Sequence, residues 1–305
     1  MPWFVLALLP PLCWSAANYL DKYVLSRAKS ASGGAYGLLI LSAAVSVAFA
    51  LGVLAFVGAD PVSAVSTTSR EFLLLSGAFE ALYILFYFLA LGKESATTVN
   101  VLFQFGPVFS LLLGFAFLHE APLPVQLLAT ALILIGSTLV VWQPGEKFEM
   151  RGDVVGLMLL ATGFLAGFIL LFKVGGGDDL GFWQAVFWQY LGIGAVGAVL
   201  ACLPFARKDF VELVRGRGTR MLAVTVGAEG ANIAAILATN AAVLVAPIGL
   251  VSSVGAVQPV FVLIEGIVLA RMLPGLKDVF ATPALRVRTL VGIALAVVGG
   301  FLISR

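Results

Sequence analysis

The sequence predicts an all-α membrane protein with ten transmembrane helices, arranged as two inverted five-helix repeats. Three observations lead to this fold class. The chain of 305 residues is 61% hydrophobic and only 11% charged, whereas about a quarter of the residues in a soluble domain carry charge. Its apolar residues form runs of about 20, long enough to cross a hydrocarbon core of about 30 Å. The second half also repeats motifs of the first. The composition excludes a soluble domain and a disordered chain, which needs low hydrophobicity and high charge.

The first half contains five apolar runs, which we interpret as five spans because residues typical of loops separate them. The runs are Trp3–Leu25, Tyr36–Val57, Glu71–Leu91, Ala96–Leu118 and Pro124–Trp142. The first run is not interpreted as a signal peptide, because it lacks a basic region and a cleavage site and is too long. We therefore keep it as a transmembrane span.

The second half contains five further runs, again separated by loop residues. They are Asp153–Val174, Phe182–Leu203, Arg220–Leu244, Ala246–Ala270 and Thr289–Ile303. In the second of these runs, Trp183, Phe187 and Tyr190 recur at helical spacing. We expect these aromatic side chains to anchor the helix at the level of the lipid headgroups.

The two halves are related by an internal repeat, which predicts one five-helix unit over residues 1–145 and a second over residues 152–305. Three sets of residues match in chain order: Lys22 with Lys173 at a separation of 151, Pro107–Gly114 with Pro259–Gly266 at 152, and Gly136 with Gly299 at 163. An odd number of spans in each unit inverts the second copy in the membrane. Inverted repeats are typical of secondary transporters, which bind their substrate between the two halves. The pattern leaves open a channel, or another membrane protein with an ancient duplication.

Three stretches also carry a likeness to a known family. The first span has WSAANYLDK, in which Trp14 is followed by Lys22 eight positions later. The fourth has SATTVNVLFQFGPVFSLLLGFAFLHE, which places a proline at Pro107 and ends at Glu120, and the fifth has small residues around Gly136. Over essentially its whole length, the chain resembles the EamA-type ten-span members of the drug/metabolite transporter superfamily. The resemblance implies a proton-coupled or exchange-type exporter of small metabolites, amino acids or drugs.

The chain departs from the family pattern at the end of the fourth span. His119 stands where the family has a glycine before Glu120, and the second copy has Arg271 and Met272 at the matching positions. Asp21, beside Lys22, is also unusual for the pattern. We expect this aspartate to neutralise the lysine locally.

The function predicted is that of a secondary transporter, with export as the expected direction, working by alternating access between the inverted repeats. A lipid-headgroup flippase or a metabolite exchanger of the same fold is the alternative. The sequence has no nucleotide-binding motif, so an ion gradient or exchange must supply the energy, with protons as the candidate coupling ion. An enzyme is not expected, because His119 is the only histidine and no HExxH or paired-Asp motif occurs.

Partners and location follow from the same reasoning. We expect a small-molecule substrate and the lipid bilayer as partners, no nucleic acid, and a monomer or homodimer. Cys13 and Cys202 lie in apolar runs without metal-ligand spacing, so neither a metal nor another cofactor is expected. The expected location is the cell membrane, as a multi-pass protein of a bacterial inner membrane.

Two carboxyls are predicted near the middle of the membrane. Glu80 lies nine residues after Glu71, and Glu229 lies nine residues after Arg220, which places each about 13.5 Å into its helix. Charged groups at that depth are costly and mark ion or substrate pathways. We predict that Glu80 and Glu229 are the coupling or gating pair, and that Glu229 dominates. The alternative for each is a buried, hydrogen-bonded carboxyl with a structural role.

Further polar and aromatic residues recur at helical spacing and are predicted to line the same lumen. They are Trp14, Asn18, Lys22, Tyr83, Asn100, Gln104, Lys173, Asn232, Gln258 and Glu265. We predict that Lys22 meets an anionic substrate group, while Lys173 could instead extend toward the interface. Hydrogen bonding between helices is the alternative for Gln104 and Gln258.

The distribution of basic residues predicts an orientation. Fourteen lie in loops after odd-numbered spans: Arg27, Lys29, Lys93, Lys147, Arg151, Arg207, Lys208, Arg215, Arg217, Arg220, Arg271, Lys277, Arg286 and Arg288. Only Arg70, Lys173 and Arg305 lie on the other side, and Lys22 lies inside its span. Because cytoplasmic loops carry the excess of Lys and Arg, the count places both termini outside. The family resemblance implies the opposite orientation.

Overall fold

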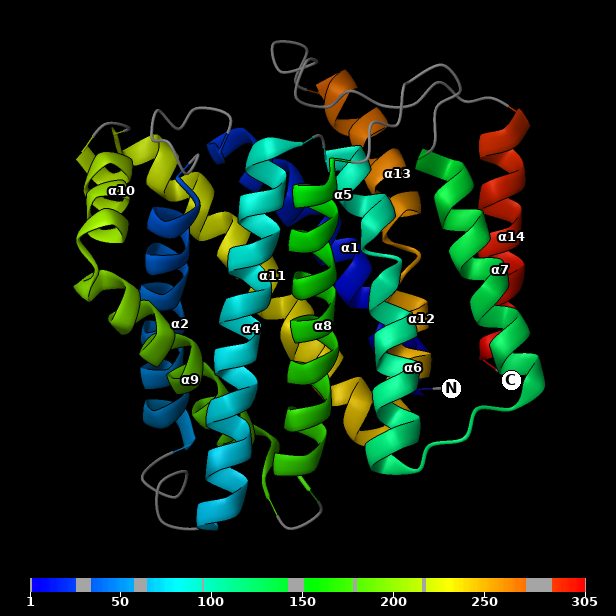
Figure 1. Cartoon of the computed structure of the whole chain (residues 1–305), viewed down its shortest axis with the longest axis horizontal. Coiled ribbons are helices and arrows are strands. Elements are labelled where there is room, and N and C mark those ends of the chain that lie inside the picture. The colour runs from blue at the N-terminus through cyan, green and yellow to red at the C-terminus, as the bar shows by residue number, and fades with distance from the viewer. Residues whose placement is uncertain are drawn as a thin grey trace.

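The chain folds into a bundle of α-helices, as seen in the computed structural model (Figure 1). The structure describes residues 2–25, 34–57, 65–94, 96–141, 151–177, 180–215, 218–272 and 287–304. The helices of the first half are α1 Pro2–Leu25, α2 Ala35–Val57, α4 Thr67–Lys93, α5 Ala96–Leu102, α6 Phe105–Leu118 and α7 Pro124–Val141. Those of the second half are α8 Gly152–Gly175, α9 Phe182–Cys202, α10 Pro204–Arg215, α11 Gly218–Val245, α12 Ile248–Gly255, α13 Gln258–Met272 and α14 Val287–Ile303.

The described residues form an all-α membrane protein, which confirms the predicted fold class. Eight helical segments within them are long and apolar enough to cross a membrane. Two shorter apolar helices, α7 and α14, occupy the predicted fifth and tenth spans. Their 18 and 17 residues correspond to about 26 Å of helix rise, close to the lower limit for a span. The count of ten spans therefore stays a prediction.

Two spans that we predicted as continuous helices are broken. The predicted span Ala96–Leu118 consists of α5 and α6, with a break at Phe103 and Gln104, and Ala246–Ala270 consists of α12 and α13, with a break at Ala256 and Val257. In both cases a proline lies shortly after the break, and a proline has no N–H to donate to the carbonyl four residues earlier. Each break therefore interrupts the regular hydrogen bonding of the helix; the carbonyl oxygen of Phe103, for example, accepts from the N–H of Gly106.

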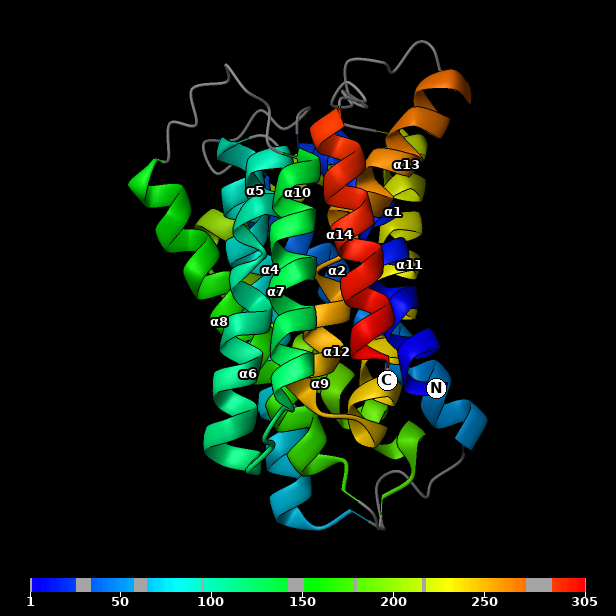
Figure 2. The same cartoon turned by 90° about the vertical axis from the view of Figure 1, so that its right-hand side faces the viewer.

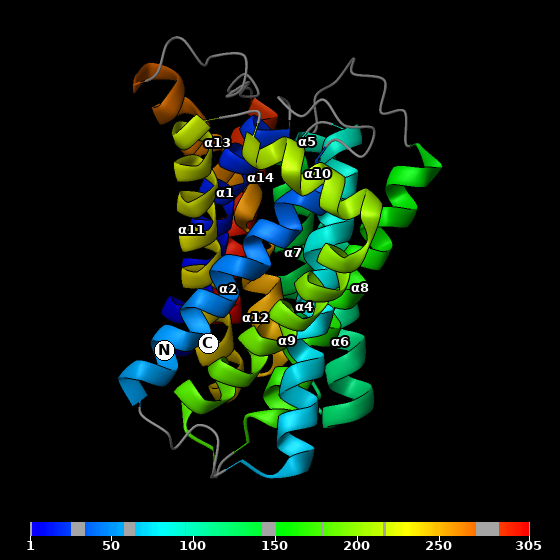
Figure 3. The ribbon, with the colours of Figure 1, turned by 90° about the vertical axis from the view of Figure 1, so that its left-hand side faces the viewer.

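A helix that the sequence analysis assigned to a loop is α10. Pro204 supplies the fixed backbone angle that favours a first helical residue, and Ala206, Asp209 and Leu213 are buried on one face. This face packs on α2 and α9, in the upper part of the molecule as drawn in Figure 3. Such a short amphipathic helix with basic residues is typical of the membrane interface. A search for apolar runs does not detect α10, because charged residues interrupt its sequence.

The helices of the first half pack extensively against those of the second. The main contacts are α1 with α11, α2 with α9 and α10, α4 with α8 and α9, α6 with α8 and α12, and α7 with α14; Figure 2 shows α7 beside α14. The last pair approaches closely, because a Cβ atom at Gly292 would lie 2.6 Å from the carbonyl oxygen of Gly136. Only small residues allow backbones to approach this closely within a membrane.

Basic residues gather at one end of the bundle. The end of α4, the start of α8, α10 and the start of α14 all lie in the upper part of Figure 1, and they carry Lys93, Arg151, Arg207 and Arg288. Lys173 lies at the opposite end, on the last turn of α8. Seven of the residues used in the charge count lie outside the described part of the chain: Arg27, Lys29, Lys147, Arg217, Lys277, Arg286 and Arg305.

Candidate functional site

Two adjoining cavities lie inside the bundle, next to both helix breaks. With the space that is open to solvent included, the smaller has a volume of about 400 Å³ and the larger about 610 Å³. Trp14, Tyr83, Phe103 and Gln258 line both of them. Because these residues come from both halves of the chain, the two cavities together form one central space between the halves.

The smaller cavity is acidic and aromatic. Its lining consists of Trp14, Ala17, Asn18, Asp21, Tyr83, Ile84, Tyr87, Phe88, Phe103, Ala228, Glu229, Asn232 and Gln258. The two carboxyls, Asp21 and Glu229, are only 7% and 4% exposed. The larger cavity is mainly apolar, with Asn100, Gln104, Thr239, Ser252 and Gln258 as its polar residues apart from the aromatic rings it shares.

One wall of the smaller cavity belongs to α1. Trp14, Asn18 and Asp21 are spaced by four and three residues, so they lie on the same helix face. The indole Nε1 of Trp14 donates to Asn232 Oδ1 of α11 at 2.9 Å, and Asn18 Nδ2 donates to Asn100 Oδ1 of α5 at 3.0 Å. These bonds hold the polar face of α1 against helices from both halves.

Tyr87 lies between two of the polar groups on α1. Its hydroxyl donates to Asn18 Oδ1 and also contacts the carboxyl of Asp21. A hydroxyl has a single hydrogen, so it cannot donate to both groups at once. Asp21 therefore keeps acceptor capacity toward the cavity.

Glu229, on α11, lines the smaller cavity. It accepts a hydrogen bond from the Ser42 hydroxyl of α2 and another from the Asn232 side chain on its own helix. Its charge acts on both Asp21 and Glu80. The ion pairs found among the described residues involve none of these three carboxyls.

Glu80 lies outside the cavity lining, in a buried polar network. It occupies the middle of α4, equally far from both ends of the helix, and is fully buried. Gln189 Nε2 of α9 donates to its Oε2 at 2.8 Å, and Asn240 Nδ2 of α11 donates to Gln189 Oε1. The other oxygen, Oε1, has no hydrogen-bond partner among the described residues. The two predicted midplane carboxyls thus differ in surroundings, since Glu229 faces the cavity and Glu80 faces this network.

The two lysines that the predicted repeat matches, Lys22 and Lys173, bind helix ends and lie outside both linings. Lys22 Nζ donates to the carbonyl oxygens of Leu91 and Glu94, each at 2.8 Å, at the end of α4. Lys173 Nζ donates to the carbonyl oxygen of Ala246, just after α11, at 2.7 Å. Cations are favourable at such C-terminal ends because they offset unpaired carbonyls. The predicted contact of Lys22 with a substrate stays a prediction.

Lys173 has a second partner that joins further helices. It forms a partly buried ion pair with Glu120 at 2.7 Å, and Glu120 Oε2 accepts from the backbone N–H of Ile248 at the start of α12, at 2.8 Å. His119 ends α6 in the left-handed conformation, with φ of 54°. Glycine is favoured in that conformation, which accounts for the glycine at this position of the family pattern. The left-handed residue also reverses the chain, so that Glu120 lies next to Lys173.

The remaining predicted residues divide between lining and support. The larger cavity is lined by Asn100, Gln104 and Gln258. The side-chain Nε2 of Gln104 also donates to the carbonyl oxygen of Ala256 at 3.4 Å. Glu265 lines neither cavity, and its carboxyl accepts from Ser15 Oγ at 2.6 Å between α13 and α1.

Sequence reasoning missed several residues of this region. Asp21 was expected only to neutralise Lys22, although its position seven residues after Trp14 places it on the lining face of α1. The sequence did not single out Gln189 and Ser42, because an isolated polar residue in an apolar helix shows no helical periodicity. Phe187 and Tyr190 are buried, so their predicted place at the headgroup level is wrong; their helix face packs inward against α4 and α2.

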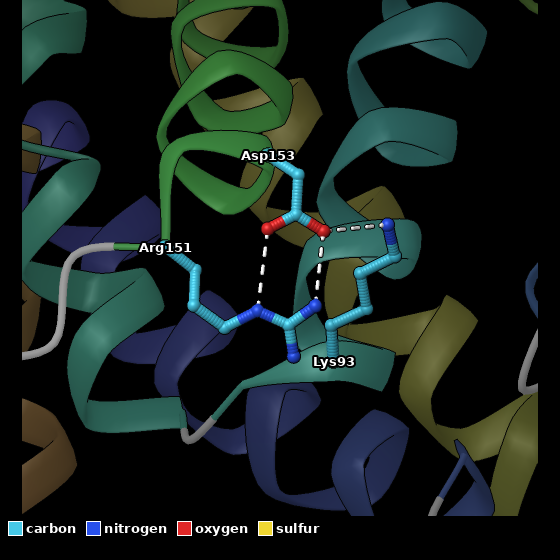
Figure 4. A network of polar contacts seen from close by, with 3 residues as sticks. All are labelled: Lys93, Arg151 and Asp153. Carbon is cyan, nitrogen blue, oxygen red and sulfur yellow. Dashed lines mark hydrogen bonds and ion pairs between the residues drawn. The ribbon is translucent and has the colours of Figure 1, made fainter.

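One polar network lies on the surface and outside the site. Asp153 at the start of α8 binds Lys93 at 3.0 Å and Arg151 at 3.2 Å (Figure 4). All three side chains are exposed by about half, so water screens both ion pairs and they contribute little to stability. No group of three or more His, Cys, Asp or Glu side chains within the described ranges could hold a metal ion.

The fold and the cavity define a multi-pass helical membrane protein with a polar space enclosed between its helices. Residues 1–142 match the family model described as the EamA-like transporter family. Over this segment, which is slightly less than half of the chain, the protein is similar to the EamA-like transporters, a family of the drug/metabolite transporter superfamily, and its apolar helices make it an integral multi-pass membrane protein. The family resemblance predicted from the sequence is thereby confirmed.

Comparison with solved structures supports the fold along the whole chain. One crystal structure, described only as that of a protein, aligns with a TM-score of 0.71 at 16% sequence identity, over 99% of this chain and 96% of the other. At that identity the likeness shows the fold alone. The comparison with curated proteins found no match.

Proposed function

We propose that the protein is a secondary transporter that exports a small metabolite, amino acid or drug by alternating access between two inverted repeats. The observation that carries this proposal is the central cavity, which is enclosed by residues of both halves and holds the buried carboxyl of Glu229. A substrate site between repeats near the membrane middle is characteristic of such transporters.

The packing of the helices supports the repeat. Exchanging the five predicted spans of one half for those of the other turns the pair α1–α11 into α8–α4 and the pair α6–α8 into α13–α1, and it leaves α2–α9 and α7–α14 unchanged. The contacts of the lysines correspond as well. Lys22 binds the carbonyl of Glu94, and its repeat counterpart Lys173 binds that of Ala246, which follows Glu94 by nearly the same interval of sequence. The starts of α6 and α13, which mark the two helix breaks, are separated by almost this interval too.

Glu229 is the residue through which we expect an ion to be coupled. A carboxyl in a cavity that opens to each side in turn takes up a proton on one side and releases it on the other. Its hydrogen bond from Ser42 joins α2 to α11, so a change in its charge alters the contact between helices of both halves. Glu80 lies within the electrostatic influence of Glu229, and we assign it the supporting role.

Flux into proteoliposomes tests the proposal. The purified protein is reconstituted without nucleotide, a pH gradient is imposed, and uptake of a panel of amino acids, amines, organic acids and drugs is measured. We expect at least one compound to accumulate, and Glu229→Gln to abolish the dependence of its flux on the gradient. Asp153→Asn, which changes only the exposed network, is the matched control and should transport normally.

The pH dependence of flux separates the two carboxyls. Glu229→Gln should flatten the pH profile of transport, and Glu80→Gln should lower the rate while leaving the shape of the profile. Unchanged profiles in both variants would show that these carboxyls are structural. Movement of a lipid reporter without flux of any panel compound would favour the flippase alternative.

A further inference from the structure

We infer that the substrate is an organic cation, an amine joined to an apolar body, with its ammonium group in the smaller cavity between Asp21 and Glu229. This inference rests on the proposed transport function and names the chemical class of its substrate. It follows from the charge, the aromatic lining and the shape of the central space.

The charge of the smaller cavity favours a cation. Asp21 and Glu229 are buried in its lining and repel one another. Among the residues that line either cavity there is no lysine, arginine or histidine. Lys22, although adjacent to Asp21 in sequence, directs its ammonium group to the carbonyls of Leu91 and Glu94. Charge repulsion between buried carboxyls is relieved when a cation binds between them.

The aromatic side chains favour the same class of ligand. Trp14, Tyr83, Tyr87, Phe88 and Phe103 surround the two carboxyls. Aromatic faces attract cations, and this attraction strengthens when the cation has lost its water. A cavity with carboxyls and aromatic rings therefore selects an ammonium group over a carboxylate or a phosphate.

The larger cavity supplies the place for the rest of the molecule. Beyond the rings it shares with the smaller cavity, it is lined mainly by apolar side chains, including Leu165, Ile169 and Val251. The buried Nδ2 of Asn100, at the boundary between the cavities, has no hydrogen-bond partner among the described residues. This amide can donate a hydrogen bond to a ligand, so the apolar body is expected to carry a hydroxyl or carbonyl oxygen.

Binding to the purified, detergent-solubilised full chain tests the class of substrate without requiring transport. Three probes share a hydroxyphenyl-ethyl body and differ in charge: tyramine is a cation, tyrosine a zwitterion and 3-(4-hydroxyphenyl)propionate an anion. Isothermal titration calorimetry measures the dissociation constant of each. We expect tyramine to bind at least about tenfold more tightly than the anion, with tyrosine between them.

Amide variants locate the site. Asp21→Asn and Glu229→Gln keep the shape of each side chain, and each should weaken tyramine binding by at least about tenfold. Asp153→Asn should leave it unchanged, and gel filtration verifies that all variants stay folded. Tighter binding of the anion, or tyramine binding that neither variant weakens, would overturn the inference. Binding of tyramine without flux in proteoliposomes would support the substrate class and contradict the transport function.

Discussion

At the scale of single residues, the ion pair of Lys173 with Glu120 connects more helices than any other in the described part of the chain. Glu120 accepts from Lys173 of α8 and from the N–H of Ile248 at the start of α12. The side chains are 23% and 14% exposed, so water screens the pair only in part. Lys173 also donates to the carbonyl oxygen of Ala246, just after α11. We call these contacts of Glu120 and Lys173 the clasp, because they hold the ends of α6, α8, α11 and α12 together.

Removal of the clasp should destabilise the protein. Glu120→Ala leaves Lys173 partly buried without its carboxylate and Ile248 N–H without an acceptor, so we expect a loss of about 2 kcal/mol. Because the two residues act together, adding Lys173→Met to Glu120→Ala should cost less than the sum of the single changes.

Thermal unfolding in detergent measures these effects. Lys93→Met removes the exposed pair of Figure 4 and serves as the control, with an expected change within about 0.5 kcal/mol. Additive losses for Glu120 and Lys173 would contradict the clasp.

Residue positions were more predictable from the sequence than side-chain directions. Trp14, Asn18 and Asn232 line the smaller cavity, because helical spacing fixes the face on which a residue lies. Lys22 and Lys173 lie on predicted helices, but their long side chains reach carbonyls that only the fold brings near. The direction of such side chains depends on neighbours that are distant in sequence.

At the scale of elements, the spans were predictable because apolar length has a direct physical cause. All ten predicted spans coincide with apolar helical segments, with ends that differ by only a few residues. The breaks before α6 and α13 were missed, although Pro107 and Pro259 belong to the repeated motif. A hydropathy profile does not detect a break in a helix, because the residues on both sides of the break are equally apolar.

The approach of α7 and α14 offers a test at this scale. Gly292→Ala places a Cβ atom 2.6 Å from the carbonyl oxygen of Gly136, so the helices must separate, and we expect a loss of about 1–3 kcal/mol. Gly52→Ala in α2, where nothing lies within 4 Å, should be neutral or stabilising by up to about 1 kcal/mol. Thermal unfolding in detergent compares the two, and equal stability would contradict the close contact.

At the scale of the whole molecule, the basic residues predict how the bundle sits in the membrane. The helix ends that carry Lys93, Arg151, Arg207 and Arg288 share one end of the bundle, as the charge count requires. The positive-inside rule assigns this end to the cytoplasm.

Reporter fusions test the orientation. The charge count predicts that Arg305 lies outside. A reporter that works only on the outer side should therefore be active when it is fused after Arg305, and one that works only in the cytoplasm should be inactive. A fusion at that point that is active only in the cytoplasm would contradict the count and agree with the orientation implied by the family resemblance.

Access to the central cavity from either side is the claim on which the proposed function depends. Ala228 lines the smaller cavity beside Glu229, and Ala228→Cys, with Cys13 and Cys202 replaced by alanine, places one thiol there. Ser66→Cys, at the exposed start of α4, is the control that should react from one side only.

Labelling of Ala228→Cys in proteoliposomes with a membrane-impermeant maleimide is therefore the most direct measurement. Alternating access predicts that the thiol reacts from both sides, and that reversing the pH gradient shifts labelling from one side to the other. Labelling from one side alone under every gradient, or equal labelling from both sides that no gradient changes, would contradict alternating access between the repeats.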